Sequence, residues 1–173
     1  MKIENITYKE LQQKSNDDRL YFETLYGYIE PLPVDGKETF TFGQVEQLCD
    51  VLQDVATYEQ ILKVVQIVFP NMNENSAANI IFGAFNGIGK AIAEILELEQ
   101  STLSSPLTAK EINAMEAVGG FDKFGRLPLL KQLAEGDVTK FDKIRATKWN
   151  ECFPLLVLNK VTNDYQNQLW KND

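Results

Sequence analysis

The chain has 173 residues, of which 44% are hydrophobic, and its 17 basic and 25 acidic residues give a net charge of −8. This length suits one domain with a real core, and the hydrophobic content excludes disorder as the default state. The acidic balance argues against phosphate-driven binding of nucleic acid and against docking on an anionic membrane surface.

The start of the chain and its two cysteines indicate where the protein works. No signal-peptide pattern follows Met1, and Cys49 and Cys152 lie far apart with no C-x-x-C spacing. They are therefore interpreted as buried thiols in a reducing compartment. The best candidate for a membrane span is interrupted by polar residues at Asn79, Asn86, Lys90 and Glu94. A soluble protein is predicted.

The N-terminal part is predicted to be a short helical arm. A capping box of Thr7 and Glu10 predicts a helix from Tyr8 to about Lys14. A second short helix is expected within residues 19–28, and it is rich in aromatic residues: Tyr21, Phe22, Tyr26 and Tyr28. Packing of these side chains in the core is favoured over an adhesive arm that contacts a partner protein, for which Trp170 near the C-terminus is a further candidate.

A proline-containing loop follows, and it divides the chain. Residues 30–38 contain two prolines and an Asp-Gly turn, which predicts a loop. We therefore expect an N-terminal arm and loop at residues 1–38 and a helical core domain at residues 39–173. The sequence TFTF at the start of the second part allows a short extended piece.

Three more capping boxes mark helix starts beyond this loop. Each has Thr followed three residues later by Glu or Gln: Thr41 with Gln44, Thr57 with Gln60 and Thr108 with Glu111. The first predicts a helix to about Gln53, the second a helix that Pro70 ends, and the third a helix that ends at Gly119.

The longest helical pattern lies between Asn75 and Glu99, and the rest of the chain is expected to pack around it. Apolar residues recur at steps of three and four: Ile81, Ala84, Phe85, Ile88, Ala91, Ile92, Ile95 and Leu96. The opposite face has Asn79, Gly83, Asn86, Lys90, Glu94 and Glu97. Gly83 and Gly87 form a G-x-x-x-G step, which predicts close packing of a neighbouring helix within the monomer, or less favourably a contact between subunits.

Three further helices are expected in the C-terminal part. Pro128 suits the first turn of a short helix that ends near Gly136, and Asp137 or Thr139 caps the next helix. The last helix is predicted from about Lys148 to Trp170, with a kink or a late start at Pro154. Its apolar stripe is Trp149, Phe153, Leu156, Val157, Val161, Tyr165 and Leu169. The predicted fold class is therefore all-α, a compact multi-helix domain with a short aromatic N-terminal helical arm.

The sequence offers little equipment for catalysis. It contains no histidine, which removes Ser-His-Asp and Cys-His nucleophiles and most zinc sites. A pair of carboxylates could still act as acid and base. The candidates are Asp17 with Asp18, Asp50 with Asp54, and Glu94 with Glu97 and Glu99, all interpreted as solvated surface charges.

The glycines of GAFNGIGK resemble part of a phosphate-binding loop. Gly89 and Lys90 fit G-x-x-x-x-G-K-[ST], but Ala84 and Ala91 occupy the first glycine and the hydroxyl position, and no strand precedes them. We therefore predict no catalytic residue, no cofactor and no metal site.

The segment from Phe121 to Leu169 carries a resemblance to a known class of proteins. It has a Phe-Gly turn at Gly125, a short helix, the sequence Leu-Ala-x-Gly-Asp around Gly136 and Asp137, another short helix and a long final helix. This pattern resembles small α-helical structural and tail-assembly proteins of tailed bacteriophages, including the crAss-like group and related phages of Bacteroidetes. It covers less than a third of the chain and brings no active site with it.

This resemblance implies a non-enzymatic virion protein in the tail or portal region, made in the host cytoplasm. The leading expectation is a subunit of a ring or connector at the head–tail junction, built from identical copies and in contact with other virion or assembly proteins. The alternative is a cytoplasmic tail-assembly chaperone that binds the tape-measure protein. Neither expectation includes specific nucleic-acid binding or a membrane.

Overall fold

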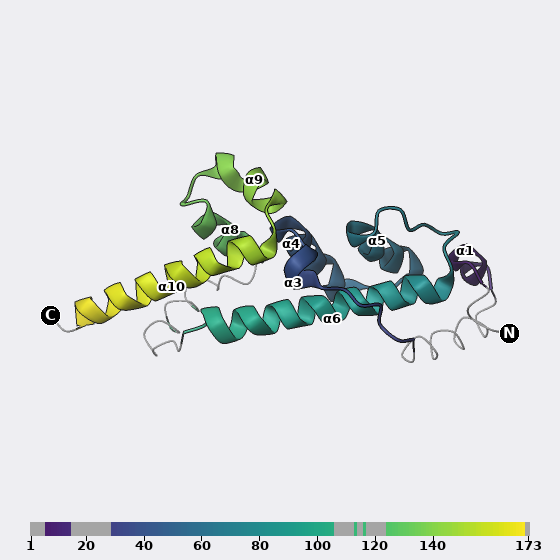
Figure 1. The fold of residues 1–173 in the computed structure, drawn as a ribbon, viewed down its shortest axis with the longest axis horizontal. Helices are drawn as coiled ribbons and strands as arrows, with labels where there is room; N and C mark the ends of the chain where they lie inside the picture. Colours follow the sequence, from purple (N-terminus) through teal and green to yellow (C-terminus); the bar gives the residue numbers. More distant parts are fainter. Residues whose placement is uncertain (1–5, 15–28, 106–112, 114–115, 117–123, 172–173) are drawn as a thin grey trace. The chain divides into compact units, whose positions relative to one another are not determined.

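The computed structural model describes residues 6–14, 29–105, 113, 116 and 124–171, and these residues form an all-α fold (Figure 1). The predicted fold class is confirmed. The described helices are α1 (Tyr8–Gln12), α3 (Gly36–Thr39), α4 (Phe42–Val51), α5 (Tyr58–Val68), α6 (Ala78–Leu103), α8 (Leu127–Leu133), α9 (Phe141–Ala146) and α10 (Trp149–Lys171), with short 3-10 helices η2 (Leu52–Asp54) and η4 (Val138–Lys140).

Local sequence signals set four of the starts of the described α-helices. The side chains of Thr7 and Thr57 accept hydrogen bonds from backbone N–H groups three residues later, and the reciprocal bonds of both capping boxes are present. Thr41 and Gln44 make the same reciprocal pair. Three predicted capping boxes are thus confirmed, whereas Thr108 and Glu111 lie outside the described residues. Pro70 ends α5, whose last residue is Val68, and Pro128 lies in the first turn of α8.

The central helix is displaced along the sequence from its predicted bounds. Residues 75–77 are not helical, because Thr7 and Ala77 form an antiparallel β-bridge and the Ala78 N–H donates to the Ile6 carbonyl at 2.8 Å. The turn before this bridge is held by the Asn73 carboxamide, which accepts from the Asn75 N–H. At the other end the helix continues beyond Glu99 to Leu103. Long-range pairing with the N-terminal segment therefore delays the start of α6.

Three smaller predictions also need correction. The predicted loop at residues 30–38 contains the start of a one-turn helix, α3. The predicted extended piece at TFTF is a single β-bridge between Thr41 and Lys148. The final helix begins at Trp149, with Pro154 inside it, so a start delayed by the proline is wrong.

The chain forms two compact units, and each is discontinuous in sequence. The first contains residues 1–36 and 47–94, and the second contains residues 37–46 and 95–173. All three boundaries fall inside helices, in α3, in α4 and in α6. The division expected from the sequence, at residue 38, stays a prediction.

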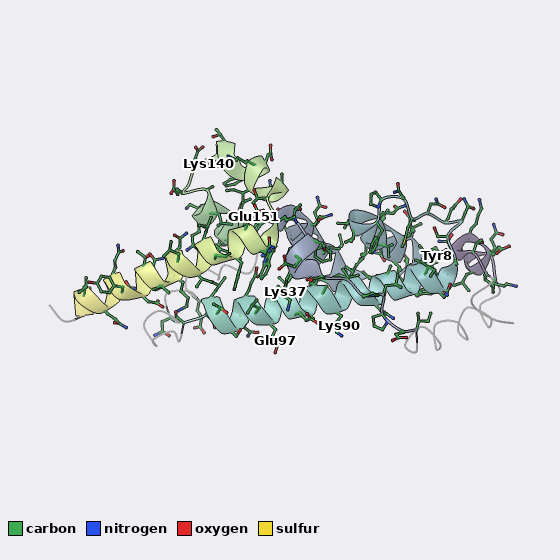
Figure 2. The ribbon with its side chains drawn as sticks, viewed as in Figure 1. Tyr8, Lys37, Lys90, Glu97, Lys140 and Glu151 are labelled. Atoms are coloured by element: carbon green, nitrogen blue, oxygen red, sulfur yellow. The ribbon has the colours of Figure 1, made fainter. Side chains whose placement is uncertain are left out.

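The core of the first unit joins α1, α5 and α6 through three aromatic rings. Tyr8 makes edge-to-face contacts with Tyr58 and Phe82 at centroid distances of 5.7 and 5.6 Å. The Tyr8 hydroxyl donates to the Tyr58 carbonyl at 2.6 Å. Figure 2 shows Tyr8 where α1 meets α6. Aliphatic side chains complete this core: Leu11, Leu48, Val64, Val65, Ile81 and Ile88.

The core of the second unit gathers the start of α4, the last turns of α6, α8 and the first half of α10. Backbone bonds join the segment before α4 to the start of α10, with Phe42 N–H donating to the Thr147 carbonyl at 2.8 Å and Trp149 N–H to the Phe40 carbonyl at 2.9 Å. The buried side chains are Phe40, Phe42, Val45, Ile95, Leu130, Ala134, Trp149, Cys152 and Leu156. Burial raises the pKa of the Cys152 thiol, whereas Cys49 is half-buried.

Among the described helices, α6 is the one whose length and composition would allow it to cross a membrane. Half of its most apolar stretch is buried within the protein, as is common for the core helix of a water-soluble fold. Length and composition alone therefore do not make α6 a membrane span.

The 3-10 helix η4 provides a test of acid stability. Asp137, one of the two predicted caps, accepts hydrogen bonds from the Thr139 hydroxyl at 2.6 Å and the Thr139 N–H at 3.0 Å. These two bonds lower the pKa of the Asp137 carboxyl. A lowered folded-state pKa adds stability above the unfolded-state pKa of about 4, and this contribution is lost as the pH falls through the folded-state pKa.

We therefore expect the wild type to be more stable than Asp137→Asn near pH 7, with the difference shrinking below about pH 4. Asparagine keeps a capping oxygen but does not titrate, so the variant isolates the charge. Denaturant unfolding of both proteins across this pH range is the measurement. A difference that stays constant with pH would contradict the expectation.

Candidate functional site

The most buried charged cluster joins three helices of the second unit. The Glu99 carboxylate accepts hydrogen bonds from both terminal nitrogens of Arg126, each at 2.6 Å, and from the Trp149 indole N–H at 2.8 Å. The Arg126 guanidinium also lies over the Phe42 ring, 5.1 Å from its centroid. Glu99 and Arg126 are each only 7% exposed. With both carboxylate oxygens bonded and little access from solvent, this cluster fits a structural role better than a reactive one.

The burial of Glu99 corrects its interpretation as a solvated charge. Glu99 lies four residues after Ile95 and seven after Ile92, so it shares the inward face of α6 with them. Glu94 and Glu97 are exposed, and Figure 2 shows Glu97 projecting from the surface of α6. Asp50 and Asp54 are exposed as well, while Asp17 and Asp18 lie outside the described residues. No group of acidic or cysteine side chains in the described part could hold a metal ion.

The glycine face of α6 contacts a non-helical segment rather than another helix. Gly83 and Gly87 are buried beneath residues 29–34, and the Leu32 N–H donates to the Gly83 carbonyl at 2.9 Å. A Cβ atom on Gly87 would overlap the Leu32 carbonyl oxygen, and one on Gly83 would lie 3.2 Å from the Glu30 carbonyl oxygen. The close approach is an internal one, and only glycine lets the backbone of residues 29–34 come so near. The predicted helical neighbour is wrong.

The aromatic residues predicted as partner contacts cannot be placed. Tyr21, Phe22, Tyr26 and Tyr28 lie outside the described residues, and so does the side chain of Trp170, although its backbone belongs to α10. Their predicted role stays a prediction.

The last helix has two apolar faces on opposite sides. Trp149, Cys152 and Leu156 are at most 3% exposed and face the core of the second unit. Leu158, Val161 and Tyr165 repeat the same spacing nine residues later, which is two and a half turns and therefore the other side of the helix at about 3.6 residues per turn. The predicted single stripe is thus wrong beyond Val157. Val161, Tyr165 and Leu169 point away from the core.

We call the second face the outward stripe of α10. Its members are more than half exposed: Leu155 54%, Leu158 60%, Val161 58%, Tyr165 63% and Leu169 52%. Figure 1 shows α10 continuing past α8 and α9 toward the C-terminus. From Leu155 to Leu169 the stripe runs roughly 21 Å at about 1.5 Å per residue. Contiguous apolar surface of this kind marks interaction sites on soluble proteins.

The outward stripe contains no charged side chain, and Glu151 lies just beyond its N-terminal end, four residues before Leu155 on the same face of α10. Between Glu151 and Lys171 the sequence contains two charged residues, Lys160 and Asp164, which pair with each other at 2.5 Å. The Asp164 carboxylate also accepts from the Ser105 hydroxyl just after α6. Lys160 lies four residues after the buried Leu156, on the side away from the stripe, whereas Asp164 lies three residues after Val161 and borders the stripe on that side. The other border is neutral, with Asn159, Thr162 and Gln166.

The energy available at the stripe is of the size needed for association. Covering the exposed half of a large apolar side chain gains about 1 kcal/mol, so five such side chains gain about 5 kcal/mol. Two such faces covering each other gain about 10 kcal/mol, within the range of about 4–15 kcal/mol that association costs in lost freedom. The stripe can therefore support a weak to moderate complex.

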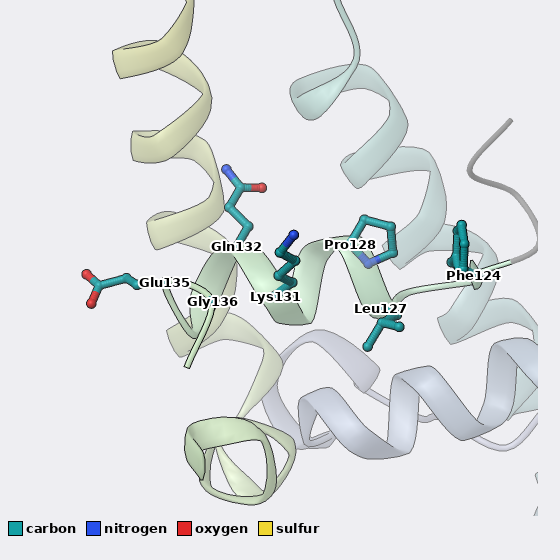
Figure 3. Close-up of a pocket in the computed structure, with 7 residues that line it drawn as sticks. All are labelled: Phe124, Leu127, Pro128, Lys131, Gln132, Glu135 and Gly136. Atoms are coloured by element: carbon teal, nitrogen blue, oxygen red, sulfur yellow. The ribbon is translucent and has the colours of Figure 1, made fainter. Parts of the chain in front are cut away.

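A second open surface lies along α8. Among the described residues, a groove of about 710 Å³ is lined by the apolar side chains of Phe124, Leu127 and Pro128 and by Lys131, Gln132, Glu135 and Gly136. Figure 3 shows these side chains along α8 and the turns at its ends. Phe124 and Leu127 are 47% and 40% exposed. All seven residues belong to the second unit, as does the outward stripe.

Sequence reasoning missed both surfaces. The signal for the outward stripe was present, since Leu155 and Leu158 are apolar and lie outside the predicted stripe of the last helix. Comparison of the chain with known protein families, curated proteins and solved structures found no match. The candidate functional site therefore rests on geometry alone: it is the outward stripe of α10, with the α8 groove in the same unit.

Proposed function

We propose that this chain is a non-enzymatic assembly protein of a tailed bacteriophage, a subunit of a ring or connector at the head–tail junction. It would be made in the host cytoplasm and reside in the tail or portal region of the virion. The observation that carries the proposal is the outward stripe of α10, five large apolar side chains each more than half exposed. A protein that works by binding other protein chains needs such a surface.

The charged groups support the same choice over an enzyme. Glu99 has its two oxygens bonded to Arg126 and Trp149, and Glu94 and Glu97 are exposed on a helix surface. None of these three offers the pair of facing carboxylates that acid–base hydrolysis uses. The net charge of −8 also suits a passage for DNA, which an acidic wall does not bind.

The second candidate is a tail-assembly chaperone that binds the tape-measure protein in the cytoplasm. One observation favours it: the outward stripe has the three- and four-residue spacing with which one helix binds another. In that case the partner would be a long helical protein and the chain would leave before the particle is complete.

Mass spectrometry of purified phage particles tests the proposal. A connector subunit is expected in the particles at a constant ratio to the other structural proteins. A chaperone is expected in the infected-cell lysate, bound to a helical partner, and absent from the particles. The lysate before assembly is the control for expression of the chain. Its presence in the lysate and absence from particles would contradict the connector function.

A further inference from the structure

The outward stripe of α10 is symmetric about its own centre to within one residue. Leu155 and Leu169 lie seven residues before and after Thr162, while Leu158 lies four before it and Tyr165 three after it. Val161 is next to the midpoint. When two copies of a helix pair in opposite directions about residue 162, Leu155 of each copy meets Leu169 of the other and Leu158 meets Tyr165.

We propose that this stripe binds the same stripe of a second copy of the chain, as an antiparallel helix pair with its two-fold axis near Thr162. A two-fold interface must be complementary to itself, because one surface supplies both sides. The antiparallel direction also places the N-terminal end of each helix beside the C-terminal end of the other, which favours the helix dipoles.

The charge distribution fits a second copy as the partner. Each chain has a net charge of −8, so two copies repel each other over most surfaces. From Leu155 to Leu169 the outward stripe has no charged side chain of its own. Asp164, which lies three residues after Val161, is paired with Lys160 within the helix, and Glu151 lies one turn before Leu155 on the same face. Between Leu155 and Leu169, two stripes can therefore meet without bringing like charges together.

The expected affinity is tens of micromolar at best, because a gain of about 10 kcal/mol less an association cost of at least about 4 leaves about 6 kcal/mol. The pairing rests on the proposed function, in which copies of the chain assemble with one another. A two-fold pair does not close a ring, so a ring built from such pairs would need a second contact between them.

Sedimentation equilibrium of the pure full-length chain is the first measurement. We expect reversible association to twice the chain mass of 19.7 kDa at chain concentrations of about 100 µM and above. Thr162 is exposed on α10, and glutamate and lysine are good helix formers, so Thr162→Glu and Thr162→Lys should both fold. Each variant alone places like charges on the two-fold axis and is expected to raise the dissociation constant at least about tenfold. An equimolar mixture of the two should restore pairing.

The matched control adds the same charge elsewhere on the helix. Asn167 is exposed and lies five residues after Thr162, on the side of α10 away from the stripe. Asn167→Glu is therefore expected to pair like the wild type. A monomeric wild type, equal pairing of Thr162→Glu and Asn167→Glu, or a Thr162→Glu and Thr162→Lys mixture that stays monomeric would each overturn the proposal.

Disulfide trapping tests the direction of the pair. Leu155→Cys and Leu169→Cys chains should cross-link to each other when mixed and oxidised, while neither cross-links with itself. Self-linking of each variant would instead show a parallel pair and contradict the proposal. The wild type is the control for the native thiols, of which Cys152 is buried. If the chain occurs in phage particles but never pairs, only the pairing is wrong; if it pairs but is absent from particles, only the connector function is wrong.

Discussion

Replacing Arg126 with alanine is expected to destabilise the protein by about 3–5 kcal/mol, the largest effect of any single substitution considered for this chain. The substitution leaves Glu99 buried at 7% exposure with the Trp149 indole as its one remaining partner in the cluster. Without Arg126, the buried carboxylate loses its electrostatic attraction to the guanidinium, but the desolvation penalty of its burial remains. Denaturant unfolding of the purified variant measures the loss.

Two further variants distinguish the effect of leaving a buried charge unpaired from the effect of losing an ion pair in general. Lys140 pairs with Glu135 at 3.2 Å, but both are well exposed, at 46% and 82%, so Lys140→Ala should cost less than about 1 kcal/mol. The double variant Glu99→Gln with Arg126→Met keeps an acceptor for Trp149, removes both charges and should recover much of the stability. Equal losses for Arg126→Ala and Lys140→Ala would show that the buried pair does not stabilise this unit.

Replacing Gly87 with alanine is expected to destabilise the first unit by about 2 kcal/mol. The new methyl group would overlap the Leu32 carbonyl oxygen and lie 3.0 Å from the Val34 side chain. Forcing an extra carbon into a packed site costs about 1–3 kcal/mol, with backbone contacts at the upper end, and the helix propensity of alanine returns about 1 kcal/mol of this.

Gly89 in the same helix is the matched control. A Cβ atom there would meet nothing within 4 Å, so Gly89→Ala should stabilise the protein by up to about 1 kcal/mol. Thermal and denaturant unfolding of the two variants should therefore shift in opposite directions. Similar shifts for both would mean that residues 29–34 do not pack on α6 in solution.

The parts of the fold that could be predicted from the sequence depend on neighbours in the chain. Thr7 bonds to a residue three positions away, and the same is true of Thr41 and Thr57, so the type and start of these helices follow from local chemistry. Pro128 and the cap at Asp137 are local in the same sense.

The parts that could not be predicted depend on distant residues. Glu99 looks like one of several surface acids until Arg126, 27 positions later, reaches it. Gly87 indicates a close contact, but nothing near it in sequence identifies Leu32 as the neighbour. In α10, apolar residues on two sides were assigned to one stripe, because spacing alone does not show which side meets the core.

The candidate site could not be predicted from the sequence either. Tyr21, Phe22, Tyr26, Tyr28 and the side chain of Trp170, which composition selected, lie outside the described residues. The outward stripe became visible only from the exposure of Leu158, Val161 and Tyr165. A helix with one apolar face in the core and a second, exposed apolar face on the opposite side has little net amphipathicity. A search for a single apolar face therefore does not detect the second one.

The division between the two units has a consequence for how the protein can be dissected. It falls between Gly36 and Lys37 in α3, between Glu46 and Gln47 in α4 and between Glu94 and Ile95 in α6. In a long helix such as α6 the backbone N–H groups bond four residues back. Cutting a helix there would leave up to four carbonyls and four N–H groups without partners on the two sides. A fragment of either unit would therefore end inside a helix and lose backbone hydrogen bonds. The chain packs as two units, but neither unit can be expressed alone with its helices intact.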